Sequence, residues 1–284
     1  MEKYNAKWLH RAALFALGVL ILLPVALTAL YSLFSPEEVL AWLSRRNSMN
    51  PEKWMPVKIS PMPVSFGQYM RVLLMEEGIL KRFFLSLGYA AAIFLGQAVF
   101  VPAVAYALSA YRFRGRGMLF SMMLLLMLLP FQVTMVPNML VLRNLKLMDT
   151  VWAVILPAWF TPFLVVLIRQ YMLGISPELY EAAQLDGAGP VRCYGAIALP
   201  VCAPVLGVAA VFSFADSWNL VEQPLVFLRS REDLQPLSTV FNRFVSKPEG
   251  TEFAGAVIYI LPALFIYLFF MDEITAGIQL TEMK

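Results

Sequence analysis

Six long apolar stretches without a charged residue constrain this chain more than any other feature. They are Ala12–Phe34, Phe83–Tyr111, Gly117–Leu142, Thr150–Ile168, Val201–Ala215 and Phe253–Met271. A helix needs about 20 apolar residues to cross the hydrocarbon core of a bilayer. We therefore predict an all-α integral membrane protein with six transmembrane helices. Their approximate limits are 12–34, 83–111, 117–142, 150–173, 201–226 and 253–271.

The composition agrees with this prediction. The chain is 60% hydrophobic and 14% charged, whereas about a quarter of the residues of soluble globular proteins are charged. A net charge of +3, with scattered basic residues, gives no indication of a nucleic-acid partner. Cys193 and Cys202 lack metal-ligand spacing, so we interpret them as reduced apolar residues and expect no metal site. The only histidine, His10, lies in the N-terminal tail, which excludes a histidine-based catalytic dyad inside the membrane.

The basic residues predict the orientation, because short cytoplasmic loops carry an excess of Lys and Arg. Both the N-terminal tail and the connection Tyr111–Gly117 are basic, and six spans place both in the cytoplasm together with the C-terminus. Lys81 and Arg82, beside the second span on the outer side, go against the rule. The first run is longer than the apolar core of a signal peptide, so we interpret it as an uncleaved span.

The remaining segments are expected to be loops of one membrane-spanning domain, residues 1–284. Residues 35–80 are rich in proline, and we predict an extracytoplasmic loop that ends in a short helix around Ser65–Arg82. Every predicted span contains at least one proline. Proline bends a helix, which suits a gated pathway, although prolines are also simply common in membrane helices.

The longest polar interruption, residues 176–200, has a distinctive pattern. Ser176, Pro177 and Glu178 are typical of a helix start. We expect the helix to end at Gly187 in a left-handed conformation, a second helix to start at Pro190, and a bend at Pro200. The small side chains of Ala182 and Ala183 would let another protein approach the first helix closely. Glu181 adjoins them and offers a charge for a cationic partner.

The spacing of this segment resembles the cytoplasmic coupling loop of membrane subunits of ABC importers. The matching positions are Glu181, Ala182, Ala183, Gly187, Ile197, Leu199 and Pro200. The stretches AYALSAYRFRGR, LLPFQVTMVPNMLVLRNLKLMDTVWAVILP and LIRQYMLGISPELYEAAQLDGAGP extend the likeness over about 66–277. They resemble carbohydrate-type importer permeases of the maltose/glycerol-3-phosphate class, in particular the second permease subunit.

This resemblance implies a set of partners in the bacterial plasma (inner) membrane. They are a second homologous permease, a cytoplasmic ATPase dimer and an extracytoplasmic substrate-binding protein. By the same likeness, Glu181, Ala182, Ala183 and Gly187 would contact the ATPase, with Ile197 and Pro200 completing the pattern. The chain contains no Gly-Lys dipeptide and hence no P-loop, so no cofactor is expected on it, and ATP and Mg²⁺ would belong to the partner ATPase.

The sequence departs from this family's usual pattern in two places. Asp216-Ser217-Trp218-Asn219-Leu220 stands where the family usually has Gly-Ser-Trp-Asn-Asp. The tail from Glu273 to Glu282 also differs from the usual basic end. The first departure bears on ordinary sugar specificity, and the second bears on contacts of the tail with the ATPase.

A possible substrate path lies on the fifth span. Ser213, Asp216, Asn219 and Gln223 would share one 120° stripe of a continuous helix at about 100° per residue. Their groups suit sugar hydroxyls, and Trp218 would stack on a sugar face. Alternatively, Asp216 pairs with a basic group of the partner permease, or the pocket lies mainly in that partner.

Two other classes of function are alternatives to the importer: an enzyme and an ATP-independent transport protein. An integral membrane enzyme would need clustered reactive Asp, Glu, His or Ser residues, and none is seen in the sequence. An ATP-independent channel or secondary transporter would be compatible with six bent helices but would not need the pattern from Glu181 to Gly187. Within the importer hypothesis, oligosaccharides, glycerol phosphates and other polyols remain alternative cargoes.

Overall fold

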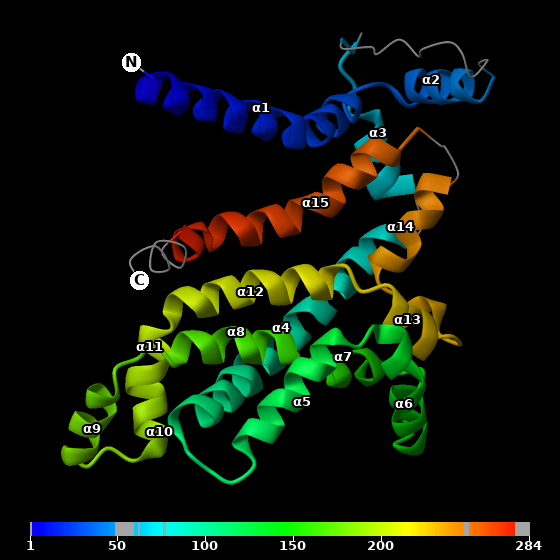
Figure 1. Cartoon of the computed structure of the whole chain (residues 1–284). Coiled ribbons are helices and arrows are strands. Elements are labelled where there is room, and N and C mark those ends of the chain that lie inside the picture. Colours follow the sequence, from blue (N-terminus) through cyan, green and yellow to red (C-terminus); the bar gives the residue numbers. More distant parts are fainter. Residues whose placement is uncertain (1, 49–59, 62, 76–77, 247–249, 276–284) are drawn as a thin grey trace. The chain divides into compact units, whose positions relative to one another are not determined.

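The computed structural model describes residues 2–48, 60–61, 63–75, 78–246 and 250–275, and these residues contain helices but no strand. Figure 1 shows the helices in chain order. The predicted all-α class is therefore confirmed.

The chain divides into two compact units. One comprises Met1–Leu80 and Phe241–Pro262, and the other comprises Lys81–Val240 and Ala263–Lys284. The first unit contains α1 (Glu2–Tyr31), α2 (Pro36–Ser48), α3 (Gly67–Met70) and the first part of α15 (Glu252–Phe269). The second contains nearly all of α4 (Ile79–Ala110), α5 (Arg116–Leu128), α6 (Phe131–Asn144), α7 (Trp152–Ala158), α8 (Pro162–Met172), α9 (Pro177–Leu185), α10 (Pro190–Cys193), α11 (Leu199–Val201), α12 (Ala203–Trp218) and α13 (Glu222–Phe227). The boundary at Val240 falls within α14 (Leu237–Ser246).

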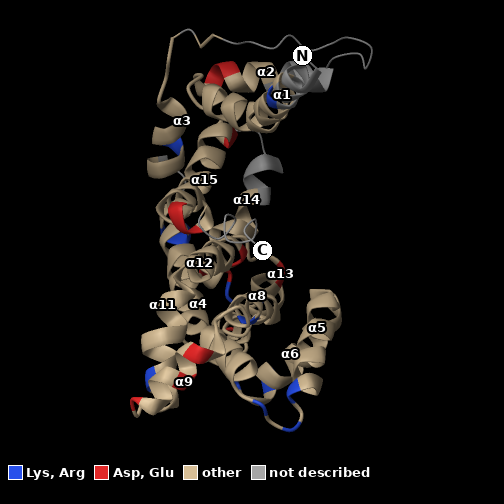
Figure 2. Ribbon diagram, turned by 60° about the vertical axis from the view of Figure 1, so that its left-hand side comes forward, with Lys and Arg blue, Asp and Glu red and all other residues tan. Residues whose placement is uncertain are grey.

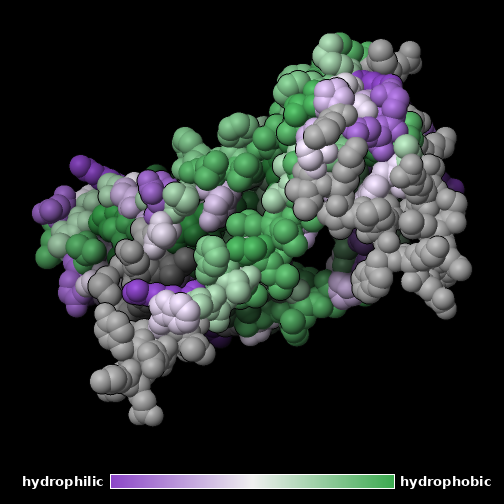
Figure 3. Space-filling view, turned by 90° about the horizontal axis from the view of Figure 1, so that it is seen from above, coloured by the Kyte–Doolittle hydropathy of each residue, from purple (hydrophilic) through white to green (hydrophobic). Residues whose placement is uncertain are grey.

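Between four and six helical segments of the described chain are candidates for membrane spans. Four helices qualify by length and hydropathy: Arg11–Tyr31, Ile79–Ala110, Trp152–Met172 and Glu252–Phe269. Two bent pairs also qualify: Arg116–Leu128 with Phe131–Asn144, and Pro190–Val201 with Ala203–Trp218. The predicted number of six is reached if each pair is counted as one span. Hydrophobic residues predominate on the described part of the face in Figure 3, as expected of a surface that contacts lipid.

The third predicted span, 117–142, is not one straight helix. Its two halves, α5 and α6, meet at an angle of 110°. Leu129 and Pro130 separate them, both with extended backbone conformations (ψ 123° and 149°). A residue that precedes proline is pushed out of the helical region by the proline ring, which explains why the helix ends there. The apolar pattern alone did not reveal this break.

The fourth predicted span, 150–173, is interrupted between α7 and α8, and α4 covers the interruption. Pro162 has no N–H, so the carbonyl of Ala158 loses its helical donor. Gln97 of α4 supplies a donor instead: its Nε2 lies 2.6 Å from the Ala158 oxygen and 2.8 Å from Thr161 Oγ1. Trp159, in the interruption, donates from Nε1 to the Ala92 carbonyl at 3.0 Å. A backbone break in an apolar environment is thus satisfied by side chains.

In the first unit, Gln68 connects two helix ends. Its Nε2 donates to the carbonyls of Tyr31 and Phe34, at 2.7 and 2.9 Å, after the last turn of α1. Its Oε1 accepts from the N–H of Ala254 in the first turn of α15, at 3.3 Å. The residue is fully buried in the turn α3, within the stretch where the sequence predicted a short helix. One amide therefore satisfies orphan groups of two helices.

We predict that Gln68→Leu lowers the free energy of unfolding by about 2 kcal/mol, because the buried hydrogen bonds of the Gln68 amide are then lost. Thermal denaturation of the purified protein in detergent measures this. Met70→Ala, at an exposed position of the same helix, is the control and should change the melting temperature little. Equal melting temperatures for Gln68→Leu and the wild type would contradict the assignment.

A second prediction concerns the contact between α4 and Trp159. A Cβ added to Gly96 would lie 2.1 Å from Trp159 Cδ1, so Gly96→Ala should destabilise the protein by about 1–3 kcal/mol through overpacking. Gly88 lies on the same helix with nothing within 4 Å of such a Cβ. Gly88→Ala should therefore be neutral or stabilising by up to about 1 kcal/mol. Denaturation of the two variants side by side tests the contact, and equal effects would refute it.

Candidate functional site

The polar loop, residues 176–200, consists of two helical arms. The first arm is α9, with Ser176 before it and Pro177 as its first residue. The Ser176 side chain makes no capping hydrogen bond, so that part of the predicted helix start is not realised. The second arm begins at Pro190, as predicted, and continues from α10 through one π-helical turn (Tyr194–Ala198) into α11.

Gly187 ends the first arm in the predicted left-handed conformation, with φ +79°. The N–H of Ala188 donates to the Ala183 carbonyl at 2.8 Å, and the N–H of Gly187 donates to the Gln184 carbonyl at 3.0 Å. This pair of bonds is the Schellman motif, which satisfies the last carbonyls of a helix. Ala183 and Ala188 also pack against the same buried cluster. The sharp turn between the arms is therefore fixed by hydrogen bonds and by packing.

The inner face of the loop packs against α4. Tyr180 of α9 and Tyr194 of the π turn lie with their ring centroids 6.1 and 5.2 Å from that of Tyr106, which is buried on α4. The Tyr106 hydroxyl also donates to the Pro190 carbonyl at 3.4 Å. Burial raises the pKa of Tyr180, so its phenol stays neutral at physiological pH. The loop is thus held by aromatic rings that the sequence analysis did not single out.

The outer face of the loop is apolar at several positions. Leu185 at the end of α9 is 90% exposed, and Val191 in α10 is 82% exposed. Glu181 and Ala182 of α9 are exposed as well, whereas Ala183, which was expected to contact the ATPase with them, is half-buried against the inner cluster. Leu185 and Val191 were not among the predicted contact residues, although both are large apolar residues that flank the turn 186–190. Exposed apolar side chains rimmed by charges are typical of a protein-binding surface.

The other pattern positions of the loop lie in its second arm. Ile197 is half-buried in the π turn, Leu199 is half-buried in α11, and Pro200 is exposed. The chain then bends by 79° between Val201 and Ala203. The predicted bend at Pro200 is therefore displaced by two residues, to Cys202, which closes α11 with ψ near 0°. No contact among the described residues connects Ile197 or Pro200 with the exposed residues Glu181 and Leu185.

The residues of the possible substrate path on the fifth span do not lie along one helix, as the expected stripe required. Helix α12 ends at Trp218, so Asn219 is its C-terminal cap and Gln223 lies in the separate helix α13. Ser213 is buried at 2% exposure, whereas Asp216 and Asn219 are exposed. A continuous stripe through all four residues is therefore not formed, because the helix on which it was drawn stops early.

Trp218 is a packing residue in this arrangement. It is 1% exposed, stacks on Phe214 at 5.7 Å and meets Phe83 edge-on at 5.6 Å. Its ring faces are therefore occupied by protein, which is incompatible with the expected stacking on a sugar. Asp216 and Asn219 are the members of the predicted path that remain on the surface.

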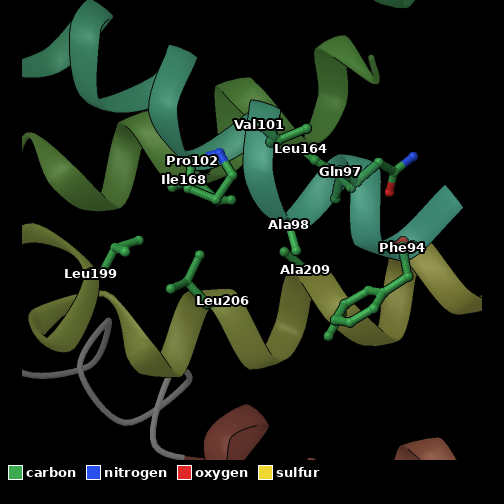
Figure 4. Close-up of a pocket in the computed structure, with 12 residues that line it drawn as sticks. Phe94, Gln97, Ala98, Val101, Pro102, Leu164, Ile168, Leu199, Leu206 and Ala209 are labelled. Atoms are coloured by element: carbon green, nitrogen blue, oxygen red, sulfur yellow. The ribbon is translucent and has the colours of Figure 1, made fainter. Parts of the chain in front are cut away.

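A cavity of about 250 Å³ lies between α4, α8 and α12. Figure 4 shows the cavity side of these helices, with Val101, Leu164 and Leu206 pointing into the space between them. Its lining is mainly aliphatic, apart from Gln97 and Ser213. A polyhydroxylated sugar needs many hydrogen-bonding partners, so this lining does not suit one.

A buried arginine ties three helices together next to the loop. Arg169 of α8 donates from Nε to the Leu108 carbonyl at the end of α4, at 3.1 Å. Its guanidinium lies 3.9 Å from the ring centroid of Phe120 in α5. Because the carbonyl end of a helix carries partial negative charge, both contacts favour the cation. The charge in an apolar span is therefore structurally compensated.

At the opposite end of α4, three polar side chains hold a later segment of the chain. Arg82 donates from Nη1 to the carbonyls of Glu232 and Gln235, at 3.0 and 3.1 Å. Tyr89 donates to the Leu234 carbonyl at 3.0 Å, and Ser86 Oγ accepts from the N–H of Leu237 at 2.8 Å. The three side chains are spaced for one helix face. Arg82, which went against the charge rule, thus has a structural partner.

The described residues contain no group of three or more His, Cys, Asp or Glu residues suited to a metal ion. The loop 176–200 is an exposed helical loop on a scaffold of packed helices. Comparison with known proteins identifies the scaffold.

The curated relatives of this chain include two arabinooligosaccharides transport system permease proteins. The chain is 35% identical to the arabinooligosaccharides transport system permease protein AraQ of Halalkalibacterium halodurans, over 66% of this chain and 67% of that protein. It is 30% identical to the protein of the same name from Bacillus subtilis, over 94% of this chain and 92% of the relative.

The fold also matches a solved structure, a bacterial ABC transporter involved in the import of the acidic polysaccharide alginate. The TM-score is 0.77 at 21% identity, and the match covers 96% of this chain and 97% of the other. Residues 98–274 match the family described as the binding-protein-dependent transport system inner membrane component. The chain belongs to this family, and it is a permease subunit of an ABC importer in the inner membrane, not an enzyme.

Proposed function

We propose that this chain is one of two homologous permeases of a carbohydrate importer, and that its loop 176–200 docks on a separate cytoplasmic ATPase dimer. The observation that carries the proposal is the pair of faces on this loop. One face is anchored to α4 through Tyr106, and the other exposes Leu185 at 90%. A loop that is rigid on one side and apolar on the other suits transmission of force from a protein partner.

The composition of the exposed face suits a protein partner better than water. Leu185 and Val191 would enter apolar depressions of the ATPase, with the flat Ala182 allowing close backbone approach. Glu181 adds a charge at the rim, where complementary charges fix orientation more than affinity. ATP and Mg²⁺ would then be bound entirely by the ATPase, and this chain would carry no cofactor.

The charges support a topology with six spans and both termini in the cytoplasm. The α4–α5 connection is rich in Arg, as Figure 2 shows in blue. This connection and the N-terminal tail would then both lie inside, in agreement with the positive-inside rule. In this topology each bent pair is one span, and segments 35–80, 143–149 and 229–252 face outward. The outer segments are the surfaces on which a substrate-binding protein would deliver its cargo.

The cargo is inferred to be an oligosaccharide, with glycerol phosphates and other polyols as alternatives. The relatives named for arabinooligosaccharides support this class. Within this chain, Asp216 and Asn219 offer exposed carboxylate and amide groups to a polar cargo. We propose that they line the path at the boundary with the second permease, while Ser213, Trp218 and Gln223 support α12 and α13 from behind.

The docking hypothesis predicts a strong effect of Leu185→Asp. The change places a charge in an interface that must exclude water, so we expect loss of ATPase co-purification and at least about a tenfold fall in ATP-driven uptake. The measurements are pull-down in mild detergent and uptake of arabinooligosaccharides by proteoliposomes with and without ATP. Gln184→Asp, which adds the same charge at the neighbouring exposed position, is the control.

Retention of the ATPase by Leu185→Asp, with normal uptake, would exclude the loop as the docking site. Uptake by the wild-type complex without ATP would instead favour a channel or secondary transporter.

A second test concerns the path. Asp216→Asn should weaken the apparent affinity for the cargo about tenfold, because hydrogen bonds to a charged acceptor contribute about 1.5–3 kcal/mol each. The measurement is the concentration dependence of uptake, with Phe212→Leu, at another exposed position on α12, as control. Unchanged affinity and rate in Asp216→Asn would remove this residue from the path.

A further inference from the structure

Tyr106 contacts both arms of the loop 176–200 from a single position on α4. Its ring lies 6.1 Å from Tyr180 on the first arm and 5.2 Å from Tyr194 on the second. Its hydroxyl reaches the Pro190 carbonyl, where the second arm begins. A further ring, Tyr111 in the α4–α5 connection, meets it edge-on at 5.7 Å. The side chain is 7% exposed and is therefore enclosed by these contacts.

The same end of α4 is also joined to the neighbouring helices. Arg169 binds the Leu108 carbonyl two residues beyond Tyr106, and its charge rests on the Phe120 ring. Tyr106, Leu108, Ile168 and Cys193 belong to one buried cluster. Close-packed clusters transmit displacement because they have little free volume to absorb it.

We propose that Tyr106 is a positioning residue that makes the loop and α4 move as one body when the ATPase displaces the loop. This inference rests on the proposed docking of the loop and goes beyond it, because it states where the movement enters the membrane. The covalent route toward α12 is less direct. Toward α12, the chain passes through the π turn and the 79° bend at Cys202.

The structure also provides a place for α4 to move. A cavity of about 250 Å³ lies between part of α4 and the helices α8 and α12, and it leaves unfilled space on that side of α4. Figure 4 shows Ala98 and Pro102 of α4 facing this space. Gln97 of the same helix, which also lines this cavity, holds the interruption between α7 and α8. Displacement of α4 would therefore reach the broken fourth span directly.

The test is the number of cargo molecules transported per ATP hydrolysed by the assembled importer in proteoliposomes. Tyr106→Leu removes the ring that both Tyr180 and Tyr194 contact. The number of cargo molecules transported per ATP should then fall by about 2- to 30-fold while ATP hydrolysis continues. Tyr106→Phe keeps the ring and its aromatic contacts and loses only the hydroxyl, so it should stay near the wild-type ratio. Tyr89→Leu is the matched control, because Tyr89 is an equally buried tyrosine at the other end of α4.

A merely structural role would lower the stability in both leucine variants but leave the ratio unchanged. A ratio in Tyr106→Leu equal to that in Tyr89→Leu would overturn the proposal. If Tyr106→Leu does not accumulate, Tyr180→Leu and Tyr194→Leu each remove one ring contact, and unchanged ratios in both would equally overturn it. Wild-type importer that transports cargo without ATP would instead contradict the proposed function.

Discussion

In an apolar environment, every backbone group released by a helix break must find its partner within the protein, and the broken helices of this chain depend on that constraint. A glutamine side chain binds backbone groups at a proline break in one unit and at helix ends in the other. Gln97 compensates for Pro162 between α7 and α8, and Gln68 joins the ends of α1 and α15. The interruption of the fourth span is thereby satisfied without water.

The loop itself illustrates how one short segment serves two opposing demands. Its turn needs a left-handed residue, which Gly187 supplies, and its inner face needs small groups, which Ala183 and Ala188 supply. The outer face of the loop exposes Leu185 and Val191 to water, which is unfavourable for apolar side chains. A permanent protein partner that covers them would remove this unfavourable exposure. The same residues are thus unfavourable in an isolated chain and favourable in an assembly.

Much of the architecture was predictable from the sequence because hydrophobic length and turn chemistry are local properties. The helical class, the two arms starting at Pro177 and Pro190, and the left-handed Gly187 all follow from neighbouring residues. The stripe through Gln223 failed because nothing local signals that α12 stops at Trp218. The roles of Tyr106 and Gln97 depend on contacts between residues distant in the chain, which spacing alone does not contain.

The most direct measurement of the central claim is site-specific photo-crosslinking from Leu185 in the intact importer. A photoreactive amino acid at this position should form its main adduct with the ATPase subunit, and the adduct should disappear when the ATPase is omitted. An adduct confined to lipid or to the second permease, with the ATPase present and active, would contradict the claim that this loop receives the force of ATP hydrolysis.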